Sequence, residues 1–319
     1  MRHGFIKTAA VTPKVQVADP EANAQEIIRL AAEAAGNGAK LIVFPELCIT
    51  GYTCGDLFLQ ELLLRRAKEE LFRIIRETAQ LDALIFAGLP WEKDGKLYNV
   101  AAAFQGGRLL GLVPKTCLPN YGEFYELRHF ARGNKEADDV WVDLGDGEGD
   151  YIPFGTKLLF TCESLPGLAV AAEICEDVWV PDPPSIRHAL AGATVIVNCS
   201  ASDETTGKDG YREALISGQS ARLVCGYIYA NAGEGESSQD LVFGGHNLIA
   251  ENGKILSRSA RFKNETIYAD LDIERIVGER RRMTTFFSKS DEVYTEIGFR
   301  LKREDTRLER LIDPAPFVP

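Results

Sequence analysis

Short runs of apolar residues alternate along the chain with longer segments in which apolar residues recur every three or four positions. The runs at 5–11 (FIKTAAV) and 40–44 (KLIVF) predict strands, because they are brief and bounded by polar or turn-forming residues. Helical spacing predicts one helix that starts near Asp19, a good N-cap, and a second helix over roughly 56–79. Apolar strands that alternate with helices are typical of sheets covered on both faces.

The middle and the end of the chain add hairpins to this alternation. Two adjacent glycines separate apolar runs at 98–105 and 108–113, and an Asn-Gly pair predicts a second hairpin within 241–260, because such pairs adopt the positive φ of tight turns. The other predicted elements are a strand at 83–87, a strand at 168–174, a helix near 183–191, a strand at 193–198 and a helix near 210–224.

One segment interrupts the pattern. Residues 131–150 (ARGNKEADDVWVDLGDGEGD) are acidic and rich in glycine, which predicts a surface loop. The sequence therefore predicts one mixed α/β domain over 1–275, followed by a tail over 276–319 that we expect to lead toward a further domain.

Composition excludes several classes of protein. With 36 Lys and Arg against 47 Asp and Glu, the net charge of −11 disfavours nucleic acid and anionic membranes as partners. No apolar stretch is long enough for a membrane span or a signal peptide, so we expect a cytoplasmic protein. Seven scattered cysteines without a CxxC pair indicate free thiols in a reducing compartment. Four histidines without an HExxH motif give little basis for a metal site.

Three segments place a reactive side chain where an apolar strand ends. Glu46 follows the strand in LIVFPELCITGY, Lys115 follows a strand in GLVPKTCLPNYGEFYE, and Cys175 ends the strand in LAVAAEICEDVWVP. The ends of strands are where active sites of α/β proteins gather. Each residue has an ordinary alternative, namely a capping carboxylate, a solvated lysine and an inert buried thiol. The acidic residues around Cys175 would raise its pKa, which makes a nearby cation such as Lys115 chemically useful.

The order and spacing of these residues carry a resemblance. Lys115 lies 69 residues after Glu46, and Cys175 lies 60 residues after Lys115, which resembles the Glu-Lys-Cys triad of the nitrilase superfamily. The segments FPELCITGYTCGDLF, KTCLPNYGEFYELRHF, CEDVWVPDPPS and YANAGEGESSQDLVFGG are similar to the glutaminase domain of glutamine-dependent NAD synthetases. The resemblance covers nearly the whole chain and implies the four-layer α-β-β-α sandwich of that superfamily.

The resemblance also implies a mechanism. Cys175 would attack the side-chain amide carbon of L-glutamine, Glu46 would act as general base and acid, and Lys115 would stabilise the oxyanion. A second carboxylate from YGEFYE would orient these groups. Glu126 fits that role better than Glu123, although Glu126 could instead pair with a nearby arginine.

Glutamine must also be held at its α-amino and α-carboxylate ends. The resemblance implies Ser202 and Lys208, in the loop NCSASDETTGKDGYR, and Tyr121 as contacts of the substrate. The alternative is that this loop is an ordinary polar turn at the surface. Trp179, four residues after the cysteine, is expected to pack rather than to bind.

The resemblance further implies a partner. Related enzymes continue into a synthetase domain with an SGGxDS-type phosphate loop, which uses ATP and Mg²⁺ to convert deamido-NAD to NAD; no such loop occurs here. We therefore expect a domain that needs no cofactor, supplies ammonia to a synthetase domain and forms a homo-oligomer. Two alternatives remain open, a freestanding amidase or carbamoylase that acts on another small amide, and a catalytically silent assembly scaffold.

Overall fold

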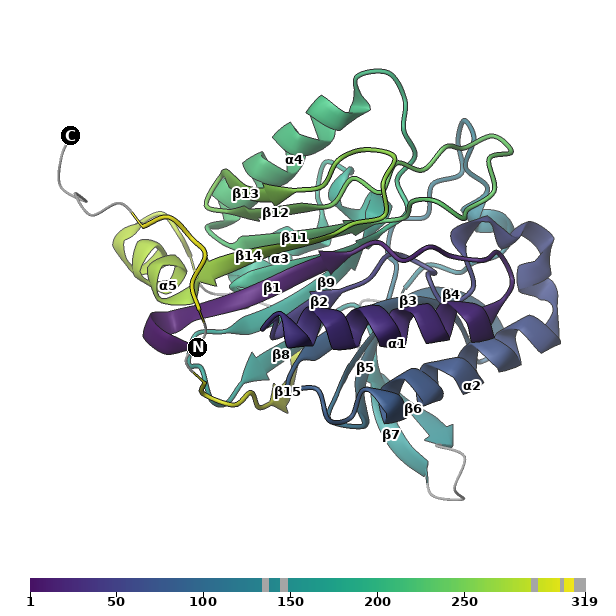
Figure 1. Cartoon of the computed structure of the whole chain (residues 1–319), viewed down its shortest axis with the longest axis horizontal. Coiled ribbons are helices and arrows are strands. Elements are labelled where there is room, and N and C mark those ends of the chain that lie inside the picture. Colours follow the sequence, from purple (N-terminus) through teal and green to yellow (C-terminus); the bar gives the residue numbers. More distant parts are fainter. Residues whose placement is uncertain (134–137, 144–148, 288–291, 305–306, 313–319) are drawn as a thin grey trace.

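Two β-sheets packed face to face form the centre of the molecule. The computed structural model describes residues 1–133, 138–143, 149–287, 292–304 and 307–312 (Figure 1). Sheet A has the order β14 (Thr266–Asp272), β1 (Phe5–Val11), β2 (Leu41–Val43), β3 (Leu84–Lys93), β4 (Lys96–Gln105), β5 (Arg108–Pro114), β7 (Gly149–Phe154) and β6 (Asp138–Asp143). Sheet B has the order β13 (Lys254–Arg258), β12 (Leu248–Glu251), β11 (Gly226–Asn231), β10 (Val195–Ser200), β9 (Ala169–Ile174), β8 (Leu158–Cys162) and β15 (Thr295–Phe299).

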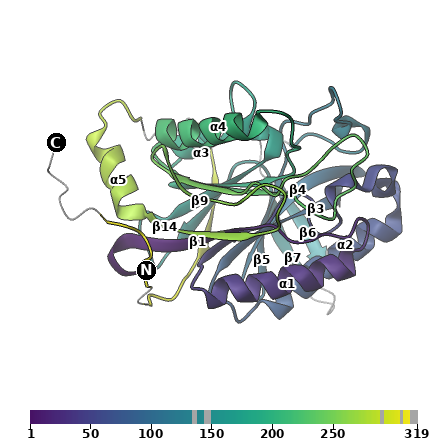
Figure 2. The same ribbon diagram turned by 45° about the horizontal axis from the view of Figure 1, so that its top comes forward.

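Helices cover the outer faces of both sheets. The α-helices are α1 (Pro20–Gly36), α2 (Glu61–Glu77), α3 (Pro184–Leu190), α4 (Lys208–Leu223) and α5 (Ile273–Arg282), and short 3-10 helices are η1 (Arg2–Gly4), η2 (Tyr52–Leu59), η3 (Glu126–Arg128) and η4 (Cys175–Val178). Helices α1 and α2 pack on sheet A, and α3 and α4 pack on sheet B (Figure 2). The predicted four-layer α-β-β-α sandwich is confirmed.

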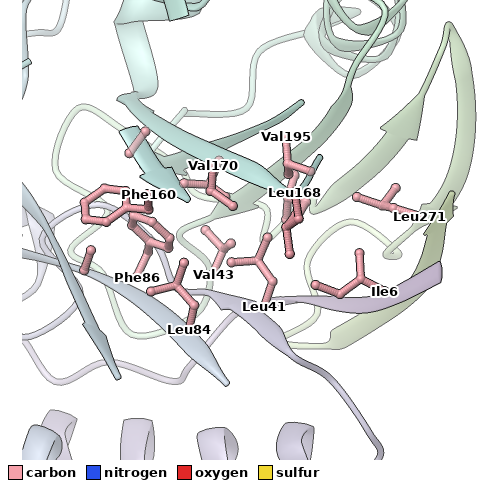
Figure 3. Close-up of a cluster of buried hydrophobic side chains, with 14 of the residues drawn as sticks. Ile6, Leu41, Val43, Leu84, Phe86, Phe160, Leu168, Val170, Val195 and Leu271 are labelled. Atoms are coloured by element: carbon pink, nitrogen blue, oxygen red, sulfur yellow. The ribbon is translucent and has the colours of Figure 1, made fainter. Parts of the chain in front are cut away.

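Strict alternation of side chains produces the inner layer. In β2, Leu41 and Val43 point into the space between the sheets, whereas Ile42 points toward the helices on sheet A. Figure 3 shows this inner cluster, in which Phe86 of β3 meets Phe160 of β8 with ring centroids 5.5 Å apart. Both faces of the central strands are buried, which explains why their sequences are apolar throughout.

The predicted helices are present, with one difference in their bounds. Asp19 caps α1 by accepting a hydrogen bond from the backbone N–H of Ala22 at 3.1 Å. The second helix does not start at 56, because η2 occupies that part of the chain and Gly55 in it has a φ of 55°. The α-helix α2 begins only at Glu61.

The prediction of a surface loop over 131–150 is wrong. Strands β6 and β7 pair antiparallel there, and Val142 lies opposite Asp150 in their register. The strands form because Val142 and Ile152 are buried in the cluster between sheet A and its helices, whereas Trp141 and Tyr151 meet edge to face on the exposed side with centroids 5.0 Å apart. The acidic residues and glycines between these positions hide the period-2 pattern. Residues 134–137 and 144–148 of this segment lie outside the described residues.

The segment predicted to be a tail takes part in the fold. The boundary at 275 falls within α5, and β15 extends sheet B by pairing parallel with β8. Arg310 donates to both carboxylate oxygens of Glu251 at 2.7 Å. In the described parts of the chain, no helix is long and apolar enough to cross a bilayer.

The contact between the sheets gives a stability prediction. Phe86 is fully buried, and Phe86→Ala leaves a cavity between the two sheets, so we expect the free energy of unfolding to fall by about 3–5 kcal/mol. Urea unfolding followed by circular dichroism measures this change. Phe287→Ala is the control, because this side chain is 73% exposed and its removal should cost less than about 0.5 kcal/mol. Equal losses in the two variants would contradict the described core.

Candidate active site

Three strand ends from the two sheets meet at one place. Glu46 lies three residues after β2, Lys115 directly follows β5, and Cys175 directly follows β9. Glu46 and Lys115 are fully buried, and Cys175 is 5% exposed. The structure thus brings together the three residues that the sequence singles out, at the seam between sheet A and sheet B.

The carboxylate of Glu46 is held on both of its oxygens. Its Oε1 accepts hydrogen bonds from the Lys115 ammonium and from the Asn99 side-chain amide, each at 2.6 Å. Its Oε2 accepts from the backbone N–H of Ala201 at 2.9 Å, in the segment after β10 of the other sheet. Asn99 was not anticipated, although an asparagine within the apolar strand KLYNVAAAF is an unusual position that could have drawn notice.

A second carboxylate lies on the other side of Lys115. The ammonium donates to Oε1 of Glu126 at 2.6 Å, and the Tyr52 hydroxyl donates to the same oxygen at 2.8 Å. The neighbouring arginine, Arg128, binds Asp56 instead, with distances of 2.6 and 2.8 Å. Of the two glutamates considered from the sequence, Glu126 is the one that contacts the lysine, and Glu123 lines the adjoining cleft.

Burial and the neighbouring charges decide the protonation of this cluster. Burial by itself lowers the pKa of Lys115, but the carboxylates of Glu126 and Glu46 raise this pKa well above its ordinary value, so the lysine is a fixed cation. Burial raises the pKa of Glu126, and Lys115 opposes that shift. One ammonium therefore serves two carboxylates in an environment without bulk water.

The turn at Cys175 has an unusual backbone. Cys175 has a φ of 44°, a value that residues other than glycine rarely adopt. Its backbone N–H donates to Oδ1 of Asn198 at 2.9 Å. Asp177 accepts from the backbone N–H of Ile174 at 2.9 Å and of Cys117 at 2.7 Å, which ties this turn to the segment after Lys115.

Burial raises the pKa of the Cys175 thiol well above its ordinary value, and Glu46 raises it further. Lys115 and a hydrogen bond with Ser200 oppose this shift. The strongest acidic neighbours are thus Glu46 and Glu126, rather than the acidic residues next to Cys175 in the sequence. These shifts together favour the protonated thiol over the thiolate.

Cys175 opens onto a cleft of about 440 Å³. The three predicted substrate contacts, Tyr121, Ser202 and Lys208, all line it. The cleft also contains Glu176, whose Oε1 accepts a hydrogen bond from the Tyr121 hydroxyl at 2.6 Å. Glu176 was not assigned a role in binding from the sequence, where it was considered only as a neighbour of the thiol.

Neighbouring side chains hold the loop that carries Ser202 and Lys208 in place. The Lys208 ammonium contacts the carboxylate of Asp203 and lies 5.3 Å from the centroid of the Trp179 ring. Arg212, which is fully buried, donates to the backbone carbonyl of Asp203 at 2.9 Å and to the Ser202 hydroxyl at 3.3 Å. Trp179 therefore packs, as expected, and also lines the cleft. The sequence gives no sign of Arg212, because an arginine on a helix is usually exposed.

Metal-binding side chains are not grouped in the described regions. Among those residues, no three or more His, Cys, Asp and Glu are placed to hold an ion. The ionisable side chains at the seam instead form a compact set of one ammonium, two carboxylates and one thiol beside an open cleft. Such a set can acylate and deacylate a thiol and stabilise negative charge on oxygen.

Comparisons with known proteins agree with this arrangement. The sequence profile of the family "Carbon-nitrogen hydrolase" matches residues 7–281. The chain is 40% identical over 328 residues to the glutamine-dependent NAD(+) synthetase of Mycobacterium tuberculosis strain H37Rv, a match that covers 100% of this chain and 48% of the relative. The chain thus spans about half the length of that relative.

Solved structures give the same result for the fold. A glutamine-dependent NAD(+) synthetase from Cytophaga hutchinsonii is similar with a TM-score of 0.74 and 32% identity, over 84% of this chain and 43% of that one. An amidase of the nitrilase superfamily from Nesterenkonia AN1 is similar with a TM-score of 0.66 and 21% identity, over 88% of this chain and 96% of that one. The latter similarity concerns the fold alone.

The charges around Cys175 predict the reactivity of its thiol. Lys115→Met removes a cation that lowers the thiol pKa, so less thiolate is present and alkylation by iodoacetamide near pH 8 should slow by about tenfold, as for a shift of one pKa unit. Glu46→Gln removes a carboxylate that raises this pKa, so alkylation should become faster by a comparable factor. Mass spectrometry of the Cys175 peptide measures both rates, and thermal melting checks that each variant is folded.

A lysine outside the lining of the cleft supplies the control. Lys14 pairs with Glu234 at the surface, and Lys14→Met should leave the rate of alkylation unchanged. Changes of the same sign in the Lys115 and Glu46 variants would contradict the described electrostatics.

Proposed function

The chain belongs to the carbon-nitrogen hydrolase family, and we propose that it hydrolyses the side-chain amide of L-glutamine. One observation carries the chemistry of this proposal. The Lys115 ammonium lies between the carboxylates of Glu46 and Glu126, beside a cleft onto which the thiol of Cys175 opens. The choice of glutamine rests on the 40% identity to glutamine-dependent NAD(+) synthetases.

In the first half of the reaction, the Cys175 sulfur attacks the amide carbon and Glu46 takes the thiol proton. Negative charge develops on the amide oxygen, and the Lys115 ammonium stabilises it. Glu46 then passes its proton to the leaving nitrogen, the C–N bond breaks, and ammonia departs from a thioester. The raised pKa of the thiol supports this order, because the proton must leave the sulfur during the attack.

In the second half, Glu46 takes a proton from water, and the resulting hydroxide attacks the thioester. The C–S bond breaks, glutamate leaves, and Cys175 regains its proton from Glu46. Glu126 does not touch the substrate in this scheme. It is a positioning residue, which holds the Lys115 ammonium from the side opposite Glu46.

The lining of the cleft fits the two charged ends of an amino acid. Glu176 and the Tyr121 hydroxyl offer oxygen acceptors for the α-ammonium group. Lys208 and Ser202 offer a cation and a hydroxyl donor for the α-carboxylate. Lys208 is paired with Asp203, so a substrate carboxylate would have to compete with that pair. We keep Tyr121, Ser202 and Lys208, the substrate contacts that the resemblance implies, as contacts of glutamine in this proposal.

We further propose that the ammonia serves a larger enzyme. Because the chain matches about half of each relative, it would act as the glutaminase part of a protein that also carries a synthetase domain, with residues 276–319 leading toward it. That domain would use ATP and Mg²⁺ to convert deamido-NAD to NAD with the ammonia released here. The domain described here would need no cofactor of its own.

A screen of amides tests the substrate. L-Glutamine should give ammonia, whereas asparagine, simple aliphatic amides and carbamoyl compounds should give at least about 100-fold less. Simple amides leave the charged groups of the site unpaired, and the side chain of asparagine is one methylene too short to bring its amide to the thiol. Cys175→Ala should abolish the activity, and Glu46→Gln should lower turnover by roughly 10²–10⁴. Cys54→Ala is the matched control, because this thiol is buried in another cluster and should be dispensable.

Other outcomes of the screen identify the alternatives. Preference for a different small amide, with dependence on Cys175 retained, would indicate an amidase or carbamoylase. No turnover of any amide would indicate a scaffold. Full activity in Cys175→Ala would remove the nucleophile from the mechanism, whatever the substrate.

Coupling to a synthetase domain generates a separate prediction. Ammonia released into water becomes ammonium, so an efficient enzyme would restrain hydrolysis until the synthetase site is occupied. A misplacement of about 1 Å can cost roughly 100-fold in rate. We expect the chain alone to bind glutamine and hydrolyse it slowly, and we expect turnover to rise when a synthetase domain with ATP and deamido-NAD is added. If the chain alone hydrolysed glutamine as fast as the complete enzyme does, the proposed restraint on hydrolysis would be wrong. The glutaminase activity itself would still stand.

A further inference from the structure

A row of polar side chains lies where sheet B is otherwise covered by apolar packing. Glu173 of β9, Asn198 of β10 and Tyr227 of β11 are on adjacent parallel strands, and Asn198 is directly opposite Glu173 in the register. All three are at most 1% exposed. Tyr227 belongs to the hydrophobic cluster that α3 and α4 form on the outer face of the sheet.

These side chains form a continuous line of hydrogen bonds. The backbone N–H of Cys175 donates to Oδ1 of Asn198 at 2.9 Å, and Nδ2 of Asn198 donates to the Tyr227 hydroxyl at 3.1 Å. The Tyr227 hydroxyl donates in turn to Oε1 of Glu173. The other oxygen of Glu173 accepts from the backbone N–H of Ser185, in the first turn of α3, at 2.8 Å. The line therefore runs from α3 to the backbone of the cysteine.

The position of this line is costly for the fold. Burial raises the pKa of Glu173 to about 7, which reflects how unfavourable an ionised carboxylate is there. An apolar row of similar volume is often no less stable than a buried polar network. Stability alone therefore does not explain why polar groups occupy these three positions.

The contact with the backbone of Cys175 gives a reason for these polar groups. Cys175 has a φ of 44°, in the left-handed region that is strained for a residue with a side chain. Such a conformation persists only where the surroundings fix it. Asn198 fixes the backbone N–H of Cys175 itself, whereas Asp177 binds the N–H of the preceding residue, Ile174. The direction of the thiol depends on this peptide.

We propose that Glu173, Tyr227 and Asn198 act together as positioning residues, which orient the backbone turn at Cys175 and so aim its sulfur at the reacting carbon. None of the three lines the cleft. Tyr227 orients the Asn198 amide so that its oxygen faces Cys175, and Glu173 anchors the Tyr227 hydroxyl. This inference rests on the proposed function in taking Cys175 as the nucleophile.

A double-mutant cycle tests the line of contacts. Tyr227→Phe removes one hydroxyl and keeps the ring, and we expect kcat for glutamine to fall about tenfold while KM changes less than about twofold, because the cleft is untouched. Asn198→Ala should lower kcat at least as much. Combined with Asn198→Ala, Tyr227→Phe should change kcat by less than about twofold, since the hydroxyl acts only through Asn198.

A second readout does not depend on the substrate. Alkylation of Cys175 by 2-chloroacetamide, followed by mass spectrometry, should slow about tenfold in Tyr227→Phe and show the same lack of additivity with Asn198→Ala. If the unaltered protein labels at Cys175 but does not hydrolyse glutamine, the proposed function fails, while the labelling rates still decide the positioning role.

Tyr294→Phe is the matched control. Its hydroxyl bonds His188 of α3 at 2.9 Å, so this change removes one hydrogen bond from the layer over sheet B, where Tyr227→Phe removes two. It should lower the melting temperature, by less than Tyr227→Phe does, and leave kcat and labelling unchanged. The proposal is overturned if Tyr227→Phe behaves like this control, or if it lowers kcat by the same factor with and without Asn198. Should Asn198→Ala not fold, the comparison of the two tyrosine variants decides.

Discussion

The buried ammonium of Lys115 is the constraint on which the site depends. A charge removed from water costs several kcal/mol unless partners replace its hydration, and two carboxylates do so here at 2.6 Å each. An ionised carboxylate is stable in this buried position only beside the ammonium. The three groups therefore hold one another in place. Removal of the ammonium would leave two buried carboxylates without a cation, and the loss of one partner from a buried pair typically costs about 3–5 kcal/mol.

This constraint explains why the site needs both sheets. Glu46 and Lys115 follow strands of sheet A, but Oε2 of Glu46 is bound by the backbone of Ala201, which follows β10 of sheet B. Cys175 follows β9, next to β10 in the same sheet. The inner apolar layer, where Phe86 meets Phe160, holds the sheets face to face and so sets the separation across which these groups meet. Packing far from the cleft thereby controls the geometry of the charges.

The sequence predicted the elements whose pattern is local. The strands around Leu41 and Val195, the cap at Asp19 and the positions of Glu46, Lys115 and Cys175 at strand ends all follow from periodicity and spacing. Strands β6 and β7 were missed, because only Val142 and its few apolar neighbours carry their alternation among acidic residues and glycines.

Residues that act through distant contacts could not be found in the sequence. Asn99 contacts Glu46 across 53 positions, and Arg212 supports the loop that carries Ser202 although it lies on a helix. Their hydrogen-bonding groups find partners only in the folded protein. For Asn99 and Glu46, a short window of sequence contains the donor or the acceptor but not both. Arg212 lies only ten positions from Ser202, but its burial is not visible in the sequence.

The protonation of the thiol links this geometry to the control of the reaction. Many reactive cysteines are stored as thiolates beside a cation. Here burial and Glu46 raise the pKa of the Cys175 thiol more than Lys115 and Ser200 lower it, which favours a neutral thiol beside a carboxylate. In the proposed mechanism, this thiol attacks the amide carbon as Glu46 takes its proton, which requires the sulfur, the carboxylate and the amide carbon to be aligned at one moment. Turnover of the amide would therefore be governed by alignment rather than by a standing charge. Any contact that shifts the turn at Cys175 or the hold on Glu46, whether from a bound substrate or from a neighbouring domain, can change the rate without changing a catalytic group.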